Sequence, residues 1–282
     1  MTKKFICIPA ILLAGLMLAA AELPKSIEIE SGKVRLRLAA EKVWNINRIE
    51  WNGNQLGVDS AGAHYGMAFQ PQQSRFYIGS GHRESGIGEE LIRLSIEVDG
   101  KAVTPENGKK ITGKKITVSK ESTVSDFVVN YSFTLADDRL DEKITIKAKK
   151  LVKVNFLYCF MHPWMTRFTD FLRINADGST EHHKFVADNK DRPIGKFNAG
   201  VWYEPKTGLA VVTVTRLEKG TRNAYRTVWD RPMYRKDYLT AYSRAYFRPE
   251  NELQASASTS FFCEKDLTKW QKSGIDLAGK LK

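Results

Sequence analysis

The chain has 282 residues, of which 42% are hydrophobic and 27% charged, and its formal net charge is +12. Three cysteines are too few for a disulfide framework, which excludes a small disulfide-stapled domain and requires a hydrophobic core. The surplus of basic residues favours an anionic partner, with solubility alone as the alternative.

The first residues are typical of an export signal. Two lysines precede a nearly all-apolar run from Phe5 to Leu18, and Ala19-Ala20-Ala21 offers small residues for cleavage. We therefore predict a signal peptide over 1–21, one β-sandwich domain over 22–282 and a periplasmic or secreted location. The apolar run is short for a membrane span and no other stretch is long enough, so we expect no stable span after cleavage.

Alternating apolar and polar residues predict strands along most of the mature chain. Ile27–Leu38 alternates on both sides of Ser31-Gly32, which indicates a hairpin. Glycine-rich and irregular sequence over 58–88 predicts a functional loop, and a polar loop is expected over Asn175–Gly195. Further strands are predicted at Val43–Trp51, Leu91–Val98, Val124–Leu135, Lys143–Lys149, Lys153–Phe160, Phe168–Ile174, Phe197–Tyr203, Leu209–Val214, Ala224–Val228, Tyr238–Phe247 and Ala255–Cys263.

Only the segment from Lys265 to the end has a helical pattern. About fifteen strands without βαβ alternation predict an all-β fold, a large antiparallel β-sandwich with a short C-terminal helix. Cys159 and Cys263 remain after processing and could form a disulfide in an oxidising compartment.

One predicted strand is followed closely by a histidine. Lys153–Phe160 leads into His162-Pro163-Trp164, and Arg167 follows three residues later. A histidine beside an indole and a guanidinium suits a binding or catalytic corner, although a histidine in such a run also serves packing.

A second candidate is the loop GSGHRESGIGEE, where glycines surround His82 and where Glu84, Glu89 and Glu90 supply carboxylates. Glycines let backbone approach a ligand and carboxylates support acid–base chemistry, while turns with solvated charges are the alternative. Glu181-His182-His183 lacks the spacing of a metal motif, and neighbouring histidines on a strand point to opposite faces. We predict no metal and no cofactor.

A basic and aromatic segment runs from Arg216 to Arg248, with nine basic residues against three acidic ones. Arginine binds carboxylate or sulfate bidentately and aromatic rings cover sugar faces, so the mixture suits an acidic saccharide. Nucleic acid would use similar chemistry, but export argues against it. The residues singled out are Arg226 and Trp229, together with one face of the last long segment, Tyr238, Thr240, Tyr242, Arg244 and Tyr246, for which an ordinary exposed face is the alternative.

Three segments carry a family resemblance: INRIEWNGNQL after the opening hairpin, FLYCFMHPWMTRF, and RPENELQASASTSFF. Their order resembles the galactose mutarotase-like group, the antiparallel sandwich of aldose 1-epimerases and of domains in polysaccharide-processing enzymes. The resemblance implies that His162 matches the general acid and His82 the earlier sugar-binding histidine. The family's base is a late glutamate, for which this chain offers only Asp230 or Glu204.

Three functions follow as hypotheses. In an epimerase, His162 would protonate the ring oxygen while a carboxylate removes the proton of the anomeric hydroxyl, and the opened sugar would reclose on its other face. In a polysaccharide lyase, Arg226 or Arg244 would neutralise a uronate, and Tyr246, Tyr242 or His162 would act as base or acid. The third is a glycan-binding envelope protein without catalysis.

Overall fold

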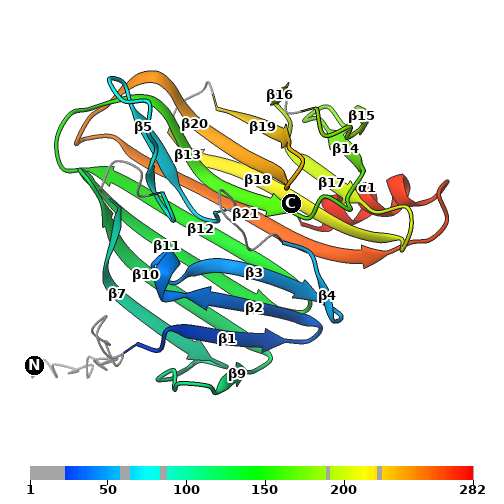
Figure 1. Cartoon of the computed structure of the whole chain (residues 1–282), viewed down its shortest axis with the longest axis horizontal. Coiled ribbons are helices and arrows are strands. Elements are labelled where there is room, and N and C mark those ends of the chain that lie inside the picture. The colour runs from blue at the N-terminus through cyan, green and yellow to red at the C-terminus, as the bar shows by residue number, and fades with distance from the viewer. Residues whose placement is uncertain (1–22, 58–63, 83–87, 189–190, 221–223, 282) are drawn as a thin grey trace, which may run out of the picture.

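The computed structural model describes residues 23–57, 64–82, 88–188, 191–220 and 224–281, and they form three sheets in two layers (Figure 1). The ten-stranded sheet makes one layer. Its order is β15 (Thr180–Lys184), β14 (Asp170–Ile174), β17 (Ala199–Tyr203), β18 (Leu209–Lys219), β21 (Glu252–Cys263), β12 (Arg139–Ala148), β11 (Phe127–Ala136), β10 (Lys115–Val124), β7 (Glu89–Val98) and β8 (Lys101–Ala102).

Two smaller sheets form the second layer and lie side by side over the ten-stranded sheet (Figure 1). The six-stranded sheet has the order β16 (Asp191–Gly195), β19 (Tyr225–Asp230), β20 (Arg235–Phe247), β13 (Val152–Trp164), β5 (Ala68–Pro71) and β6 (Ile78–Gly79). The five-stranded sheet has the order β4 (Asn54–Gln55), β3 (Asn45–Trp51), β2 (Val34–Ala39), β1 (Ser26–Ser31) and β9 (Lys110–Thr112). Among these described pairings, only β1 with β9 is parallel.

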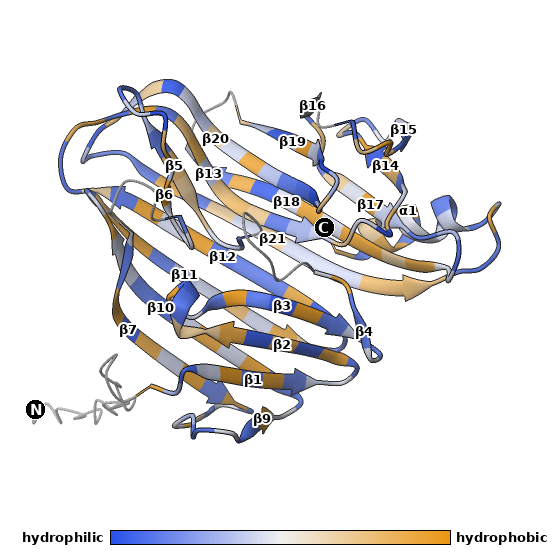
Figure 2. Ribbon diagram, viewed as in Figure 1, coloured by the Kyte–Doolittle hydropathy of each residue, from blue (hydrophilic) through white to orange (hydrophobic). Residues whose placement is uncertain are grey.

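Period-two sequence patterns produce the long strands of the large sheet. Strands β10, β11 and β12 each have ten residues, and buried side chains alternate with accessible ones along all three. Figure 2 shows the same alternation as bands of hydrophobic and hydrophilic residues across the sheet. One face of this sheet therefore packs on the core and the other meets solvent.

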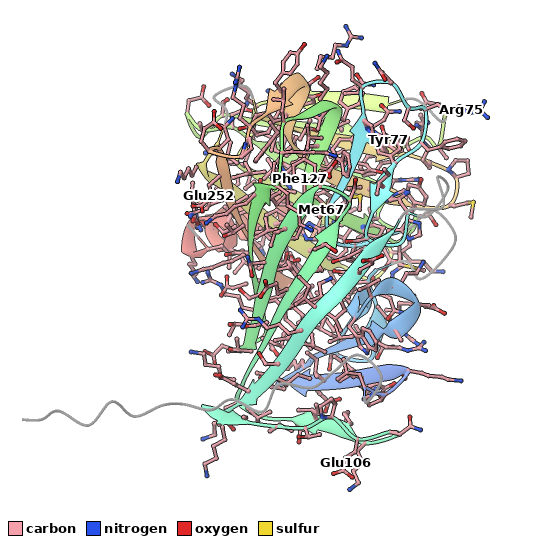
Figure 3. All side chains as sticks on the ribbon, turned by 90° about the vertical axis from the view of Figure 1, so that its left-hand side faces the viewer. Met67, Arg75, Tyr77, Glu106, Phe127 and Glu252 are labelled. Carbon is pink, nitrogen blue, oxygen red and sulfur yellow. The ribbon has the colours of Figure 1, made fainter. Side chains whose placement is uncertain are left out.

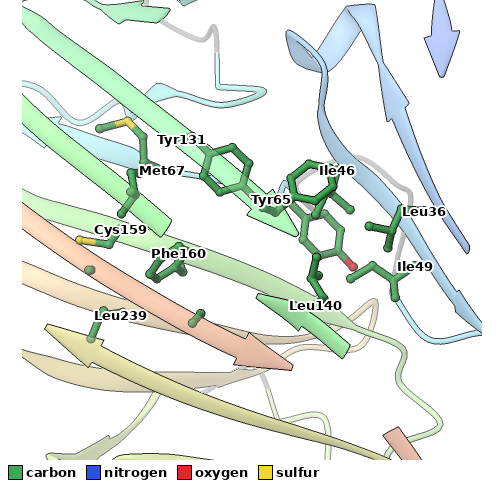
Figure 4. Close-up of a cluster of buried hydrophobic side chains, with 14 of the residues drawn as sticks. Leu36, Ile46, Ile49, Tyr65, Met67, Tyr131, Leu140, Cys159, Phe160 and Leu239 are labelled. Atoms are coloured by element: carbon green, nitrogen blue, oxygen red, sulfur yellow. The ribbon is translucent and has the colours of Figure 1, made fainter. Parts of the chain in front are cut away.

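The core lies between the layers. Seen edge on in Figure 3, Phe127 and Met67 lie inside, Glu252 lies on the outer side of the ten-stranded sheet, and Tyr77 and Arg75 lie on the opposite side. Side chains from all three sheets belong to this core, and in Figure 4 it runs from Leu36, Ile46 and Ile49 past Tyr65 and Leu140 to Phe160, Cys159 and Leu239. The structure thus has the all-β sandwich architecture that the sequence predicts.

Two segments predicted as loops contain strands. The glycine-rich stretch over 58–88 includes β5 and β6, which pair with each other and place β5 beside β13. The polar stretch includes β15, which pairs with β14, and β16, which pairs with β19. Strand β15 lies at a sheet edge and four of its five side chains are exposed, so it lacks the hydrophobic alternation that marks a half-buried strand.

The helix α1 (Trp270–Lys280) packs on the outer face of the ten-stranded sheet. A Cβ atom at Gly274 would lie 2.8 Å from a methyl carbon of Val201, so this glycine permits close approach of helix to sheet. No helix of the described residues is long and apolar enough to cross a membrane. Cys159 and Cys263 are both free, so the disulfide considered from the sequence is not formed.

Candidate functional site

His162 lies on the inner face of β13, between the layers. Its side chain is 2% exposed, and its ring stacks between Phe160 and Trp164. The Nε2 atom is 2.7 Å from Oε2 of Glu142 on β12, and the hydroxyl of Tyr131 donates to the other oxygen of Glu142 at 2.6 Å. His162 and Trp164 are therefore core residues, and the contact between His162 and Glu142 bridges the two layers.

The charge of Glu142 decides the protonation of His162. Burial disfavours the imidazolium, but the negative charge of Glu142 and its hydrogen bond outweigh burial, so the pKa of His162 is raised above its ordinary value. When His162 is protonated, its imidazolium and the carboxylate of Glu142 form a buried ion pair that crosses the sandwich. A general acid must reach its substrate, and this side chain faces the core instead.

Arg226 also faces the core. Its guanidinium is fully buried, pairs with Asp237 and donates to the hydroxyl of Thr213 at 2.7 Å. The guanidinium carbon lies 4.4 Å from the centroid of the Phe197 ring. Asp237 pairs with His162 in the β13–β20 register, so the two buried ion pairs are neighbours. A uronate could reach Arg226 only by displacing Asp237.

The two carboxylates expected as bases hold turns instead. Asp230 is fully buried, accepts the backbone N–H groups of residues 186 and 187 at 2.7 and 2.8 Å, and lies 3.0 Å from Arg235. Glu204 accepts the hydroxyl of Thr207 at 2.5 Å and lies 3.5 Å from Arg167. Arg167 in turn donates to the carbonyl of residue 55 at 2.7 Å. These contacts connect loops at the edge of the sandwich.

The predicted tyrosine and arginine face of β20 is broken by irregularities. Ala241 and Tyr242 both pack against the core, because Ala241 is an extra residue between the pairs Leu157–Tyr242 and Tyr158–Thr240. Arg244 has a φ of +49°, which also interrupts the alternation. Tyr246 remains exposed and pairs with Lys153, which lies nine residues along β13 from His162, or roughly 30 Å at about 3.3 Å per residue. These side chains and His162 do not form one site.

The outer face of the six-stranded sheet carries a different cluster. Tyr158 and Met161 on β13 and Tyr238 on β20 pack together there, with Tyr77 and Trp229 against them. We call this cluster, with two histidines and a lysine that contact it, the aromatic face; it comprises His64, Tyr77, His82, Tyr158, Trp229, Lys236 and Tyr238.

Ring contacts connect the members of the aromatic face in a continuous row. The His64 and His82 rings are 4.6 Å apart, and His82 lies 5.7 Å from Tyr77. Tyr77 stacks on Tyr158 at 5.7 Å, and their hydroxyls are 3.2 Å apart. The row then continues from Tyr158 to Tyr238 and to Trp229, each step 4.7 Å between centroids.

Glycine conformation places the histidine pair. Gly81 has a φ of +74°, and a Cβ atom there would lie 2.4 Å from Nδ1 of His64. The sequence predicts glycines that let the backbone approach a ligand; in the structure, Gly81 lets it approach the His64 ring. Next to this turn, Ser80 donates to Glu89 at 2.9 Å.

Glu89 anchors that turn from the core. It forms a fully buried ion pair with Lys120 at 2.7 Å and also accepts hydrogen bonds from Asn45 and Ser122. Burial raises the pKa of Glu89, but Lys120 and the hydrogen bonds hold it below its ordinary value. Glu89 is thus a structural carboxylate. Glu84, the other candidate of this loop, lies outside the described residues.

The aromatic face is cationic around His64. Burial first, and then the charges of His82, Lys42 and Lys236, lower the pKa of His64 to about 3. The ring is therefore neutral near pH 7. Lys42 Nζ lies 3.1 Å from Nδ1 of His64 and donates to it, which leaves the proton of the neutral ring on Nε2. Lys236 Nζ also lies 5.1 Å from the centroid of the Tyr238 ring.

Of the residues predicted for the site, His82, Trp229 and Tyr238 belong to the aromatic face. Sequence reasoning missed His64, Tyr77, Tyr158 and Lys236 as its members. The alternation of Phe156 and Tyr158 against Leu157 was a usable signal for an aromatic outer face of β13. In the part of the chain that the structure describes, no group of three or more potential ligands could hold a metal ion.

The fold defines the class of architecture: a galactose mutarotase-like β-sandwich. A galactose mutarotase related enzyme from Lactobacillus acidophilus is similar, with a TM-score of 0.50, 11% identity, and coverage of 86% of this chain and 98% of that one. A mutarotase candidate, YeaD, from Salmonella typhimurium has a TM-score of 0.55 and 10% identity, with coverage of 85% of this chain and 90% of that one. The GH36 alpha-galactosidase AgaB from Geobacillus stearothermophilus has a TM-score of 0.53 and 8% identity, with coverage of 85% of this chain and 40% of that one. No family model and no curated protein sequence matches the chain.

Proposed function

We propose that this protein binds an anionic carbohydrate on the aromatic face and performs acid–base chemistry of the aldose-epimerase type on its sugar ring. The observation that carries the proposal is the continuous row of rings from His64 to Trp229, with lysines at its edge. Aromatic rings cover the apolar faces of sugars, and cations attract a carboxylate or sulfate. The signal-like N-terminus supports an exported location, where such a ligand would be met.

The two histidines take different roles in this proposal. His82 is half-buried and is the proton-transferring residue. His64 stays neutral and donates a hydrogen bond from Nε2, because Lys42 occupies its Nδ1 atom. Trp229, which is half-buried, covers the sugar ring, and the partly exposed Lys42 attracts the acidic group.

Polarimetry tests the catalytic part. We expect faster interconversion of the anomers of galacturonate or glucuronate than of the corresponding neutral aldoses, and a loss of about 100-fold or more in the His82→Ala variant. His183→Ala is a matched control, since His183 lies in β15 away from the aromatic face. If no sugar in the panel is interconverted faster than without protein, epimerase chemistry is excluded.

A second candidate is a polysaccharide lyase acting on uronic-acid polymers. It is favoured by the hydroxyls of Tyr77 and Tyr158, 3.2 Å apart beside His82, since a tyrosine hydroxyl can serve as base or acid. Rising ultraviolet absorbance of unsaturated product from alginate, pectate or a glycosaminoglycan would identify it. Saturable, salt-sensitive retention on these polymers without turnover would indicate glycan binding alone.

A further inference from the structure

The outer face of the ten-stranded sheet, on the side away from the aromatic face, carries a hollow of about 510 Å³. It lies across β7, β10, β11 and β12, and its volume is within the range of ligand sites. The side chains that point into it come from alternate positions of these strands. They are Arg93, Ser95, Glu97, Ser119, Glu121, Asn130, Ser132, Lys143 and Thr145, and we call this set the polar trough.

Strand register arranges the trough in two rows. Ser95, Ser119, Ser132 and Lys143 are consecutive partners across the four strands. The neighbouring row is Arg93, Glu121, Asn130 and Thr145. Adjacent strands are about 4.8 Å apart, so each row presents a polar group at every strand along a straight line.

The trough contrasts with the row beside it. There the hydroxyls of Thr117 and Thr134 are 3.1 Å apart, and Ser258 donates to Asp141 at 2.6 Å. Within the described chain, by contrast, the side chains of the trough's three serines, Asn130 and Thr145 form no hydrogen bond with another protein group. Their donors and acceptors are thus available.

The chemistry of the trough is polar and balanced in charge. Arg93 and Glu121 form an ion pair at 2.7 Å, and Lys143 and Glu97 supply one further charge of each sign. The one aromatic ring at the trough belongs to Tyr131, whose hydroxyl bonds Glu142 in the core. Serine and threonine hydroxyls and the asparagine amide both donate and accept, which matches a ligand whose own groups do both.

We propose that the polar trough binds an extended neutral polysaccharide that lies across the strands. Such a chain carries hydroxyls at regular intervals, and the two rows offer it a partner at each strand. The balanced charges give no preference for an acidic polymer, in contrast with the aromatic face. The trough therefore serves as a second glycan-binding surface on the opposite side of the molecule.

Affinity electrophoresis in gels containing xylan, mixed-linkage glucan or galactomannan tests the proposal. We expect retention on at least one polymer, and at least a tenfold weaker apparent affinity in the triple variant Ser119→Ala, Asn130→Ala, Ser132→Ala. The double variant Thr117→Ala, Thr134→Ala changes the adjacent row and should bind as the parent does.

A further variant, Trp229→Ala, separates this proposal from the proposed function. It should leave retention on neutral polymer unchanged, whereas it should weaken binding of acidic sugars. The proposal is overturned if the parent protein is retained by none of the three polymers, or if the triple variant and the parent are retained equally. Loss of neutral-polymer retention in Trp229→Ala alone would also overturn it, by assigning the binding to the aromatic face.

Discussion

Both faces of the six-stranded sheet carry histidines among aromatic rings, but only the inner histidine is paired with a buried carboxylate. On the inner face of β13, His162 lies between aromatic rings and is paired with Glu142 across the sandwich. On the outer face, Tyr158 joins a row of rings that ends at a histidine pair flanked by lysines. A histidine among aromatics is therefore not by itself a site. The inner His162 has a carboxylate in contact that raises its pKa, whereas burial and neighbouring cations lower the pKa of the outer His64.

The largest expected effect is a loss of unfolding free energy when a histidine of the inner face is replaced, but not when one of the outer face is. His162→Ala leaves the carboxylate of Glu142 buried without its cation, and breaking a buried pair costs about 3–5 kcal/mol of unfolding free energy. Urea denaturation measures this loss. The control His82→Ala, on the outer face, should lose less than about 1 kcal/mol; equal losses in both variants would remove the distinction.

The second effect concerns the turn below the histidine pair. Gly81→Ala and Gly100→Ala both place a side chain at positive φ, at a cost of about 1–2 kcal/mol each. Only at Gly81 does the new Cβ atom meet a ring, that of His64, since nothing lies within 4 Å at Gly100. We therefore expect a lower melting temperature and weaker acidic-sugar binding for Gly81→Ala than for Gly100→Ala. Identical behaviour would show that the close approach is unimportant.

The third effect is on ligand binding alone. Trp229 is half-buried at the end of the aromatic row, with Arg231 4.8 Å from its ring. Trp229→Ala should weaken retention on an acidic polysaccharide by about 5- to 30-fold, the equivalent of 1–2 kcal/mol for an aromatic contact. Tyr246→Ala changes an exposed tyrosine far along β20 and should leave retention unchanged. If only Tyr246→Ala weakens retention, the binding site lies at the Tyr246 end of β20 instead.

The smallest effect is a pH dependence of stability. Because the folded pKa of His162 is raised, its contribution is complete below the unfolded value of about 6.5 and is lost as pH rises through the folded pKa. The urea midpoint of the parent should therefore fall from pH 6 upward more steeply than that of His162→Leu. A parent midpoint that rises relative to the variant over this range would contradict the buried ion pair.

The fold was predictable because most of its strands are half-buried. Strands such as β10 and β11 alternate along their whole length, and this pattern requires only one core face. Strand β15 could not be found in this way, because it lies at an edge with exposed side chains on both faces. The pairing of β5 with β13 also depends on long-range register that no local pattern contains.

The site was less predictable, because it too depends on contacts between residues far apart in the sequence. Sequence indicated His82 and Trp229 from local composition, but it could not show that Arg226 and Asp237 neutralise each other inside the core. It assigned Tyr242 to the outer face by strict alternation, and one extra residue invalidated that assignment. The aromatic face combines residues from 64 to 238, and only the fold brings them together.

The extra residue of β20, Ala241, has a counterpart on β13, where Cys159 is also unpaired. The two irregularities compensate, so the register is the same on both sides of them: from Val152–Phe247 to Leu157–Tyr242 and from Phe160–Leu239 to Trp164–Arg235. A one-residue insertion or deletion in either strand is tolerated only if the other strand changes in length as well. Related chains should gain or lose these two positions together, which makes their joint presence a marker for aligning sequences too divergent to compare by identity.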